Sequence, residues 1–394
     1  MSFLLYAIGL AAIFFSDIVV TNLMNQEQIA DWALFRSLVG ISAVLPLTGL
    51  DQVLVRSPQS SARLMRRLAL QIPMVGLLVG LILDITDILD HWALGAGLAI
   101  GSALSLKLFQ YFRSHHRRVL AQLAQQGWKI GALGLLAYLV ATDTNADLIL
   151  CGVVLLFVAD AVACVFVWRN PPKTMMPQTP EPMAALYSIG VRFMVTGLFL
   201  ALSVYAEQIV VNRLGTTDQA ALYFTSATYF LFPMAFVNGY VSFLAGPWVR
   251  DNADQAFTVL GKWGLRGSLA IIAYGALLNA IGWIAWQITD PTVGSVNTEL
   301  QIVFGFICIV RTVYILPSAY VGVLGRPRQH DMLILSQVAA LAIVVALFLA
   351  LRASGFDLIH AVALSSITNW TLRCLAGFAI MNQIHQTRPG AYDA

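Results

Sequence analysis

Charged residues are scarce in this sequence. Only 11% of the 394 residues are Asp, Glu, Lys or Arg, while 59% are hydrophobic, and a soluble domain carries about 25% charged residues. So few charges exclude an ordinary soluble globular protein. The composition instead indicates a chain whose solvent is the lipid bilayer.

Catalytic, cofactor-binding and metal-binding motifs are also missing. The four cysteines, Cys151, Cys164, Cys308 and Cys374, lie inside apolar stretches without metal-ligand spacing, which argues against a disulfide, haem or zinc site. There is no phosphate-cradling glycine loop, nucleophile elbow or metal-ligand cluster, so no cofactor and no nucleic acid are expected. The sequence therefore predicts a protein that is not an enzyme.

One enzymatic alternative is a membrane-embedded polysaccharide polymerase or ligase. Such enzymes have a different architecture, in which a large external loop holds the catalytic residues. Here the largest external connection, residues 289–299, contains no basic residue and no histidine. This alternative is therefore the weaker one.

Long apolar runs fill almost the whole chain. A spanning helix needs ~20 mainly apolar residues, and these runs are continuous where a membrane β-strand would alternate. We predict an all-α integral membrane protein with twelve transmembrane helices. Pro46, Pro73, Pro233 and Pro317 fall inside these segments and predict kinks. The segments are residues 2–24, 32–55, 67–89, 92–112, 119–140, 148–168, 183–211, 220–248, 263–288, 300–324, 332–351 and 359–381.

Lysine and arginine cluster in every second connection between these segments. In a bacterial inner membrane such connections face the cytoplasm, so both termini are predicted to be cytoplasmic. The other connections hold only Arg213 and Arg352 as basic residues. The cytoplasmic set consists of Arg56, Arg63, Arg66, Arg67, Arg113, Arg117, Arg118, Arg169, Lys173, Arg250, Lys262, Arg326, Arg328 and Arg388.

A proline-rich connection divides the chain into two sets of six segments. We predict an N-terminal lobe at residues 1–168, a cytoplasmic linker at 169–182, a C-terminal lobe at 183–381 and a cytoplasmic tail at 382–394. Six is an even number, so the two lobes have the same orientation and form a parallel repeat.

The first hairpin of each half supports this repeat at one constant offset. Asp17-Ile-Val-Val-Thr-Asn22 corresponds to Glu207-Gln-Ile-Val-Val-Asn212. The later positions Ala30 and Gly49 correspond to Ala220 and Gly239. An acid near the outer end of the helix is common to both hairpins.

The pattern from Glu207 to Tyr223, with its echo from Asp17 to Trp32, resembles the polysaccharide-unit (Wzx-type) flippases. These belong to the multidrug/oligosaccharidyl-lipid/polysaccharide (MOP) exporter superfamily. The resemblance implies two six-helix bundles around a central cavity, with an undecaprenyl-diphosphate-linked oligosaccharide as substrate. Membrane lipids, a polysaccharide polymerase and a chain-length regulator are the implied partners. The chain lacks the extra pair of C-terminal helices of the related lipid II flippases, which argues against a lipid II substrate.

Several cations lie deep within the predicted segments, where a charge costs ~2.5–3.5 kcal/mol. Because a sugar diphosphate is a polyanion and guanidinium groups bind phosphate oxygens bidentately, we expect these cations to bind the substrate. Snorkelling to lipid headgroups is the alternative for those nearer the membrane surface, and a drug/cation antiporter of the same superfamily is the alternative function. The predicted substrate-binding residues are Arg36, Lys129, Arg192, Arg311 and Arg373, and Lys107 is a further deep cation.

The deep acids are candidates for binding a coupling ion. Asp17 and Glu207 occupy matching places in the two halves, and Asp160 lies mid-segment. With no nucleotide-binding motif present, we expect a proton or sodium gradient to drive transport. The structural alternative for Asp17 and for Glu207 is that each pairs with another helix or hydrogen-bonds to the neighbouring hairpin. The alternative for Asp160 is that it neutralises Lys129.

Overall fold

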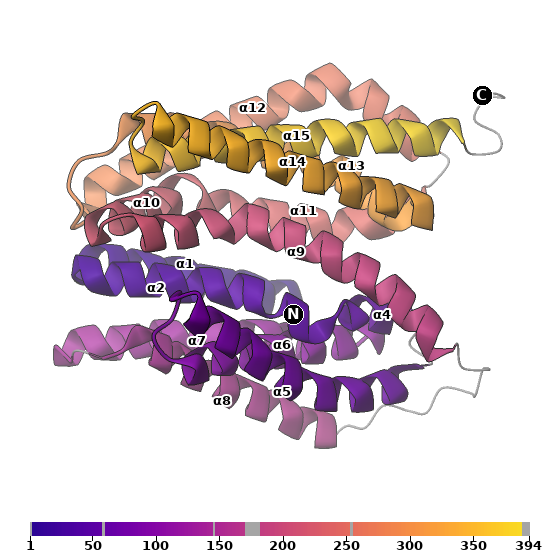
Figure 1. Cartoon of the computed structure of the whole chain (residues 1–394), viewed down its shortest axis with the longest axis horizontal. Coiled ribbons are helices and arrows are strands. Elements are labelled where there is room, and N and C mark those ends of the chain that lie inside the picture. Colours follow the sequence, from indigo (N-terminus) through magenta and orange to yellow (C-terminus); the bar gives the residue numbers. More distant parts are fainter. Residues whose placement is uncertain (1, 57–59, 145, 170–181, 253–254, 388–394) are drawn as a thin grey trace. The chain divides into compact units, whose positions relative to one another are not determined.

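The computed structural model describes residues 2–56, 60–144, 146–169, 182–252 and 255–387. Within these residues every regular element is a helix and none is a strand (Figure 1), which confirms the predicted all-helical class. The chain forms two compact units, Met1–Ala221 and Leu222–Ala394, and each is described by itself. The predicted linker at 169–182 lies almost wholly outside the described residues, so the predicted lobe boundary stays a prediction.

The described part of the first unit contains nine complete helices and the start of a tenth. Within it α1 packs along α7, and α5 packs along α6. The helices are α1 (Ser2–Leu23), α2 (Gln26–Ser42), α3 (Val44–Leu47), α4 (Leu50–Arg56), α5 (Ser61–Ile85), α6 (Trp92–Ser114), α7 (Arg118–Thr142), α8 (Leu148–Arg169), α9 (Met183–Leu214) and the beginning of α10 (Thr217–Phe230).

The described part of the second unit contains the rest of α10 and five further helices. Within it α15 packs against both α13 and α14. The helices are α11 (Phe232–Asp251), α12 (Ala256–Thr289), α13 (Thr298–Leu324), α14 (Pro327–Ala353) and α15 (Leu358–Gln386). Because α15 extends to Gln386, the first residues of the predicted tail are helical.

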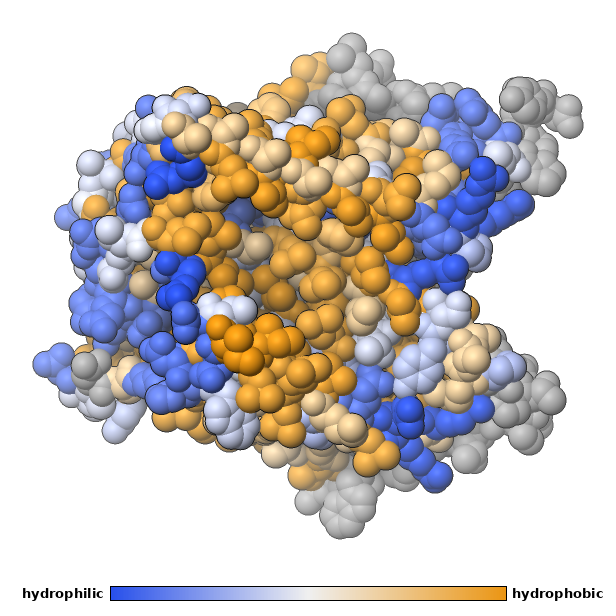
Figure 2. Space-filling view, viewed as in Figure 1, coloured by the Kyte–Doolittle hydropathy of each residue, from blue (hydrophilic) through white to orange (hydrophobic). Residues whose placement is uncertain are grey.

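Each predicted segment except the second and the eighth coincides with one helix. Among the described residues nine helices are long and apolar enough to cross a membrane. α7, α10, α11 and α15 are not in this set. Large apolar side chains such as Leu70, Met74 and Leu335 are exposed, and Figure 2 shows hydrophobic residues over the middles of the helices and hydrophilic residues at their ends. This distribution is that of a multi-pass membrane protein.

Two of the four predicted proline kinks are actual breaks. The second segment is divided into α2, α3 and α4, with Pro46 in the four-residue α3, and the eighth is divided at Leu231, with Pro233 in the first turn of α11. By contrast, α5 and α13 continue through Pro73 and Pro317. At the offset that pairs Asp17 with Glu207, Pro46 and Pro233 lie three residues apart.

The turn between α3 and α4 depends on two left-handed residues. Thr48 has φ 47° and Gly49 has φ 70°. A Cβ atom at Gly49 would overlap the backbone carbonyl oxygen of Gly190 on α9, so only glycine lets the two backbones approach this closely.

We therefore expect Gly49→Ala to destabilise the protein. Left-handed backbone at a residue other than glycine costs about 1–3 kcal/mol, and the steric overlap with Gly190 adds to this cost. The apparent unfolding temperature of the detergent-purified protein measures the loss. Gly134→Ala, in the middle of α7 with open space around the added carbon, is the matched control and should unfold at or slightly above the wild-type temperature. Equal unfolding temperatures for the two variants would contradict the proposed constraint.

Candidate functional site

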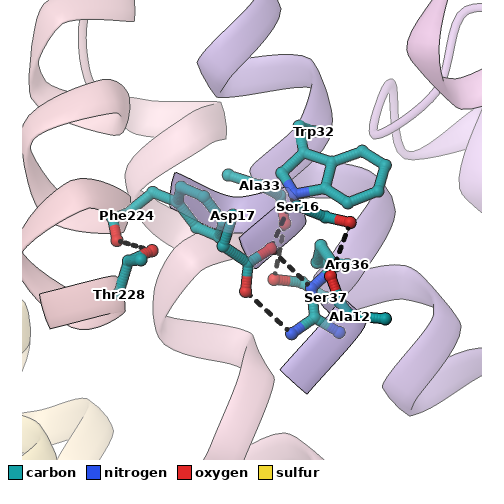
Figure 3. A network of polar contacts seen from close by, with 9 residues as sticks. All are labelled: Ala12, Ser16, Asp17, Trp32, Ala33, Arg36, Ser37, Phe224 and Thr228. Atoms are coloured by element: carbon teal, nitrogen blue, oxygen red, sulfur yellow. Dashed lines mark hydrogen bonds and ion pairs between the residues drawn. The ribbon is translucent and has the colours of Figure 1, made fainter. Parts of the chain in front are cut away.

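An ionic network lies buried between α1 and α2 of the first unit. Asp17 is only 1% exposed, and its Oδ1 atom accepts hydrogen bonds from Trp32 Nε1 at 2.7 Å and Arg36 Nε at 3.1 Å. Its Oδ2 atom accepts a third from Arg36 Nη2 at 3.2 Å. Figure 3 shows the guanidinium of Arg36 and the indole of Trp32 converging on the carboxylate. The pair is therefore bidentate, the strong geometry for an arginine and a carboxylate.

The short connection between α1 and α2 fixes this geometry. Asn25 caps α2 by accepting a hydrogen bond from the backbone N–H of Gln28, and the Gln28 side chain accepts one from the backbone N–H of Asn25. This capping box sets where α2 begins. Trp32 and Arg36 are four residues apart and so face α1 together.

Lys129 on α7 is the second cation of the network. Its Nζ atom donates to Gln126 Oε1 at 2.8 Å, and it interacts electrostatically with both Asp17 and Arg36. Gly9 lets α7 approach α1 here, because a Cβ atom at Gly9 would overlap the Gln126 side chain. The network thus brings one carboxyl group and two basic side chains together.

A second polar group lies buried between α6 and α8. Ser105 Oγ donates to Asp160 Oδ1 at 2.6 Å, and Lys107 interacts electrostatically with the same carboxyl group. Asp160 and Lys107 are both buried. The Oδ2 atom of Asp160 is buried without a hydrogen-bond partner among the described residues. The alternative in which Asp160 neutralises Lys129 is not what the structure shows, because Ser105 and Lys107 are the groups that interact with Asp160.

Two arginines of the second unit lie against aromatic rings. The Arg311 guanidinium is 4.5 Å from the centre of the Trp370 ring, and that of Arg373 is 5.4 Å from Tyr314 and 5.7 Å from Trp370. The two rings contact each other edge to face, and Arg373 is only 3% exposed. We call these four residues the arginine–aromatic cluster.

The helices that carry this cluster contain no deep acid. No Asp or Glu occurs in residues 300–324 of α13 or 358–386 of α15. Aromatic faces attract cations through their negative quadrupole, by about 0.5–1 kcal/mol when exposed and ~2 or more when desolvated. The cluster thus holds two positive charges together without a carboxylate from either helix.

The structure brings the predicted residues together in groups. Arg36, Lys129 and Asp17 form one group, and Arg311 and Arg373 form another. Arg192 donates to the Ser188 backbone oxygen at 3.2 Å and to its hydroxyl at 3.0 Å, within α9. Glu207 lies half-buried on α9.

Sequence reasoning missed the neutral partners, namely Trp32, Ser105, Gln126, Tyr314 and Trp370. The four-residue spacing of Trp32 and Arg36 is a signal that would have identified the first of them. Among the described residues no group of three His, Cys, Asp or Glu side chains is arranged to hold a metal ion.

The fold is that of transporters of the MATE family. The structure is similar to the MATE multidrug transporter DinF-BH in complex with a ligand, with a TM-score of 0.63 and 12% identity, over 100% of this chain and 95% of that one. It is also similar to a variant of the Vibrio cholerae MATE transporter VcmN, with a TM-score of 0.57 and 12% identity, over 100% and 96% of the two chains.

A third similar structure is the inward-facing conformation of a multidrug resistance MATE family transporter of the MOP superfamily. Its TM-score is 0.57 and its identity 12%, over 96% of both chains. No protein-family model matches the sequence, and no curated protein does. The similar folds thus lie in the superfamily that the sequence resemblance named, and the Wzx-type subtype stays a prediction.

We expect the Asp17–Arg36 pair to be essential for stability. Removing one partner of a buried ion pair costs about 3–5 kcal/mol because the other charge stays buried and unpaired. Asp17→Asn and Arg36→Gln should therefore each lower the unfolding temperature strongly, and the double variant should recover part of the loss.

The matched control is the exposed pair between Arg213 Nη2 and Asp87 Oδ2, 2.9 Å apart, with side chains 50% and 73% exposed. An exposed pair contributes about 0–1 kcal/mol, so Asp87→Asn and Arg213→Gln should have little effect. Additive losses at Asp17 and Arg36, no larger than those at the control pair, would show that the buried pair is not coupled.

Proposed function

We propose that this chain is a membrane transporter that works by alternating access. One observation supports this most directly: a MATE transporter fold contains a buried carboxyl group, Asp17, inside a membrane helix, in a network with Arg36 and Lys129. Ionisable residues inside a membrane segment are costly and mark solute or ion pathways. The similar structures are all transporters, which agrees with the non-enzymatic interpretation of the sequence.

The main candidate substrate is an amphipathic organic compound. Two of the similar structures are described as multidrug transporters, and one of them is in complex with a ligand. On this proposal the chain is a drug/cation antiporter, which exports such a compound in exchange for a cation. The fold supports this candidate better than any other.

The second candidate is the lipid-linked oligosaccharide that the sequence resemblance implies. One observation favours it: the arginine–aromatic cluster places Arg311 and Arg373 together on helices without a deep acid. A cationic drug would be repelled by this cluster, whereas a sugar diphosphate would be attracted, with Arg36, Lys129 and Arg192 as further cations. A polysaccharide polymerase and a chain-length regulator would then be partners in the bacterial inner membrane.

Transport by proteoliposomes distinguishes the two candidates. An antiporter should accumulate ethidium, a fluorescent amphipathic cation, under a proton or sodium gradient, and Arg311→Gln/Arg373→Gln should leave this uptake unchanged or increase it. A flippase should instead translocate a polyprenyl-diphosphate-linked disaccharide. The same double variant should then lose at least tenfold in rate, because hydrogen bonds to charged groups contribute about 1.5–3 kcal/mol each and ~1.4 kcal/mol is tenfold.

Arg328→Gln/Arg352→Gln is the matched control, since it removes two positive charges from exposed helix positions. It should transport either substrate at the wild-type rate. Proteoliposomes that move neither substrate would contradict both candidates.

Asp160 is our proposal for the group that binds the coupling ion. Asp17 accepts three hydrogen bonds from Trp32 and Arg36, whereas Asp160 Oδ2 is buried without a partner among the described residues. A buried, unsatisfied carboxylate oxygen is costly, and a bound proton or sodium ion removes that cost. Glu207, half-buried on α9, remains a further candidate.

We expect Asp160→Asn to abolish the dependence of transport on the ion gradient while the protein stays folded. The measurement is substrate uptake with and without an imposed proton or sodium gradient, with thermal unfolding as the folding check. Ser105→Ala, which removes the 2.6 Å hydrogen bond, should weaken the gradient dependence less. Asp90→Asn, the same change at an exposed loop position, should behave as wild type. Gradient-driven uptake by Asp160→Asn at the wild-type rate would assign the coupling ion elsewhere.

A further inference from the structure

A cavity of about 430 Å³ opens in the first unit where α5 and α9 begin. It is lined by Arg63, Arg66, Arg67, Leu70, Met183 and Tyr187. None of these residues belongs to the buried networks described above. The cavity is therefore a separate feature of the first unit.

The polar side of the cavity is strongly cationic. Arg63, Arg66 and Arg67 are spaced by three and four residues along α5, so they share one face of the helix. No Asp or Glu occurs in residues 52–83 or 183–206, so neither α5 before Asp84 nor the first part of α9 supplies a carboxylate. Arginine forks match the geometry of phosphate oxygens.

Tyr187 holds one of these arginines in place. Its hydroxyl accepts a hydrogen bond from Arg67 Nε at 3.1 Å and donates one to Gln71 Oε1 at 2.9 Å. The Gln71 amide donates in turn to the Pro46 carbonyl and to the Thr48 hydroxyl, both at 2.8 Å. The wall of the cavity is thus a hydrogen-bonded structure that reaches the break between α3 and α4.

The apolar side of the cavity continues along the surface of α5. Leu70 is 68% exposed and Met74 is 72% exposed, one turn further along the helix. Exposed apolar side chains then follow to the end of α5, namely Leu77, Leu78, Leu81, Ile82 and Ile85. A ligand with a phosphate group at the arginines and an acyl chain along this row would contact both the cationic and the apolar side of the cavity.

We propose that this cavity binds an anionic membrane phospholipid, with its phosphate at Arg63, Arg66 and Arg67 and an acyl chain along α5. A free phosphate ion would use the arginines but leave the apolar row of α5 without a role. The predicted topology places these arginines on the cytoplasmic side, where anionic headgroups attract basic residues. A bound lipid would also join the beginnings of α5 and α9, next to the break at Thr48.

Lipid binding by the full chain in detergent tests the proposal. Native mass spectrometry of the purified protein gives the apparent affinities for phosphatidylglycerol and for phosphatidylcholine. We expect phosphatidylglycerol to bind at least tenfold more tightly to the wild type. Arg66→Gln/Arg67→Gln should lose this preference, and Arg66→Gln alone should lose part of it and serves if the double variant unfolds.

The matched control is Arg118→Gln/Arg328→Gln, which removes the same charge from exposed positions on α7 and α14. It should retain the wild-type preference for phosphatidylglycerol. Equal preference in Arg66→Gln/Arg67→Gln and in this control would overturn the proposal.

Two further arms separate a lipid from a free anion. Leu70→Gln/Met74→Gln should weaken the binding of phosphatidylglycerol at least severalfold and leave that of inorganic phosphate unchanged. If inorganic phosphate displaces phosphatidylglycerol at similar concentrations, the cavity is a free-anion site and the lipid assignment is wrong. None of these measurements depends on transport, so their outcome is independent of the proposed function.

Discussion

The buried carboxylate of Asp17 is the constraint on which the first unit depends. A charge in the hydrocarbon layer is tolerated only where protein groups replace its water. Trp32 and Arg36 do this from the next helix, and in doing so they fix how α2 faces α1. α7 then brings Lys129 to the same place through the contact at Gly9. Two local features position these side chains. They are the capping box at Asn25 and the four-residue spacing of Trp32 and Arg36.

The two units hold their buried cations by different physical means. In the first unit a carboxylate accompanies each group, with Asp17 beside Arg36 and Lys129, and Asp160 beside Lys107. In the second unit Arg311 and Arg373 lie on the faces of Trp370 and Tyr314. An ion pair cancels most of the field of a cation, whereas an aromatic ring stabilises the cation and leaves its charge. A drug-type interpretation of the fold has to account for these two arginines on α13 and α15.

Hydropathy predicted the helices well because the apolar length of a segment and the location of its prolines are local properties. It did not predict which prolines break a helix, since Pro46 and Pro233 lie at breaks while α5 and α13 continue through Pro73 and Pro317. The deep charges were also identifiable from the sequence, because depth follows from position along a segment. Their partners were not, because depth does not say which neighbouring helix a side chain faces. Asp160 is the clear case: neutralisation of Lys129 was the structural alternative for it, and Ser105 and Lys107 are its neighbours.

The two halves of the internal repeat differ in the residues that accompany their matching acids, Asp17 and Glu207. The offset that pairs Asp17 with Glu207 also pairs Trp32 with Leu222 and Arg36 with Ser226. Neither Leu222 nor Ser226 carries a charge, and leucine has no side-chain hydrogen-bond donor. The second hairpin thus keeps the acid without the indole and guanidinium that hold its counterpart. If both acids had the same structural task, their partners would be expected to repeat with them. Asp17 and Glu207 therefore lie among different residues, and their roles have to be assigned separately.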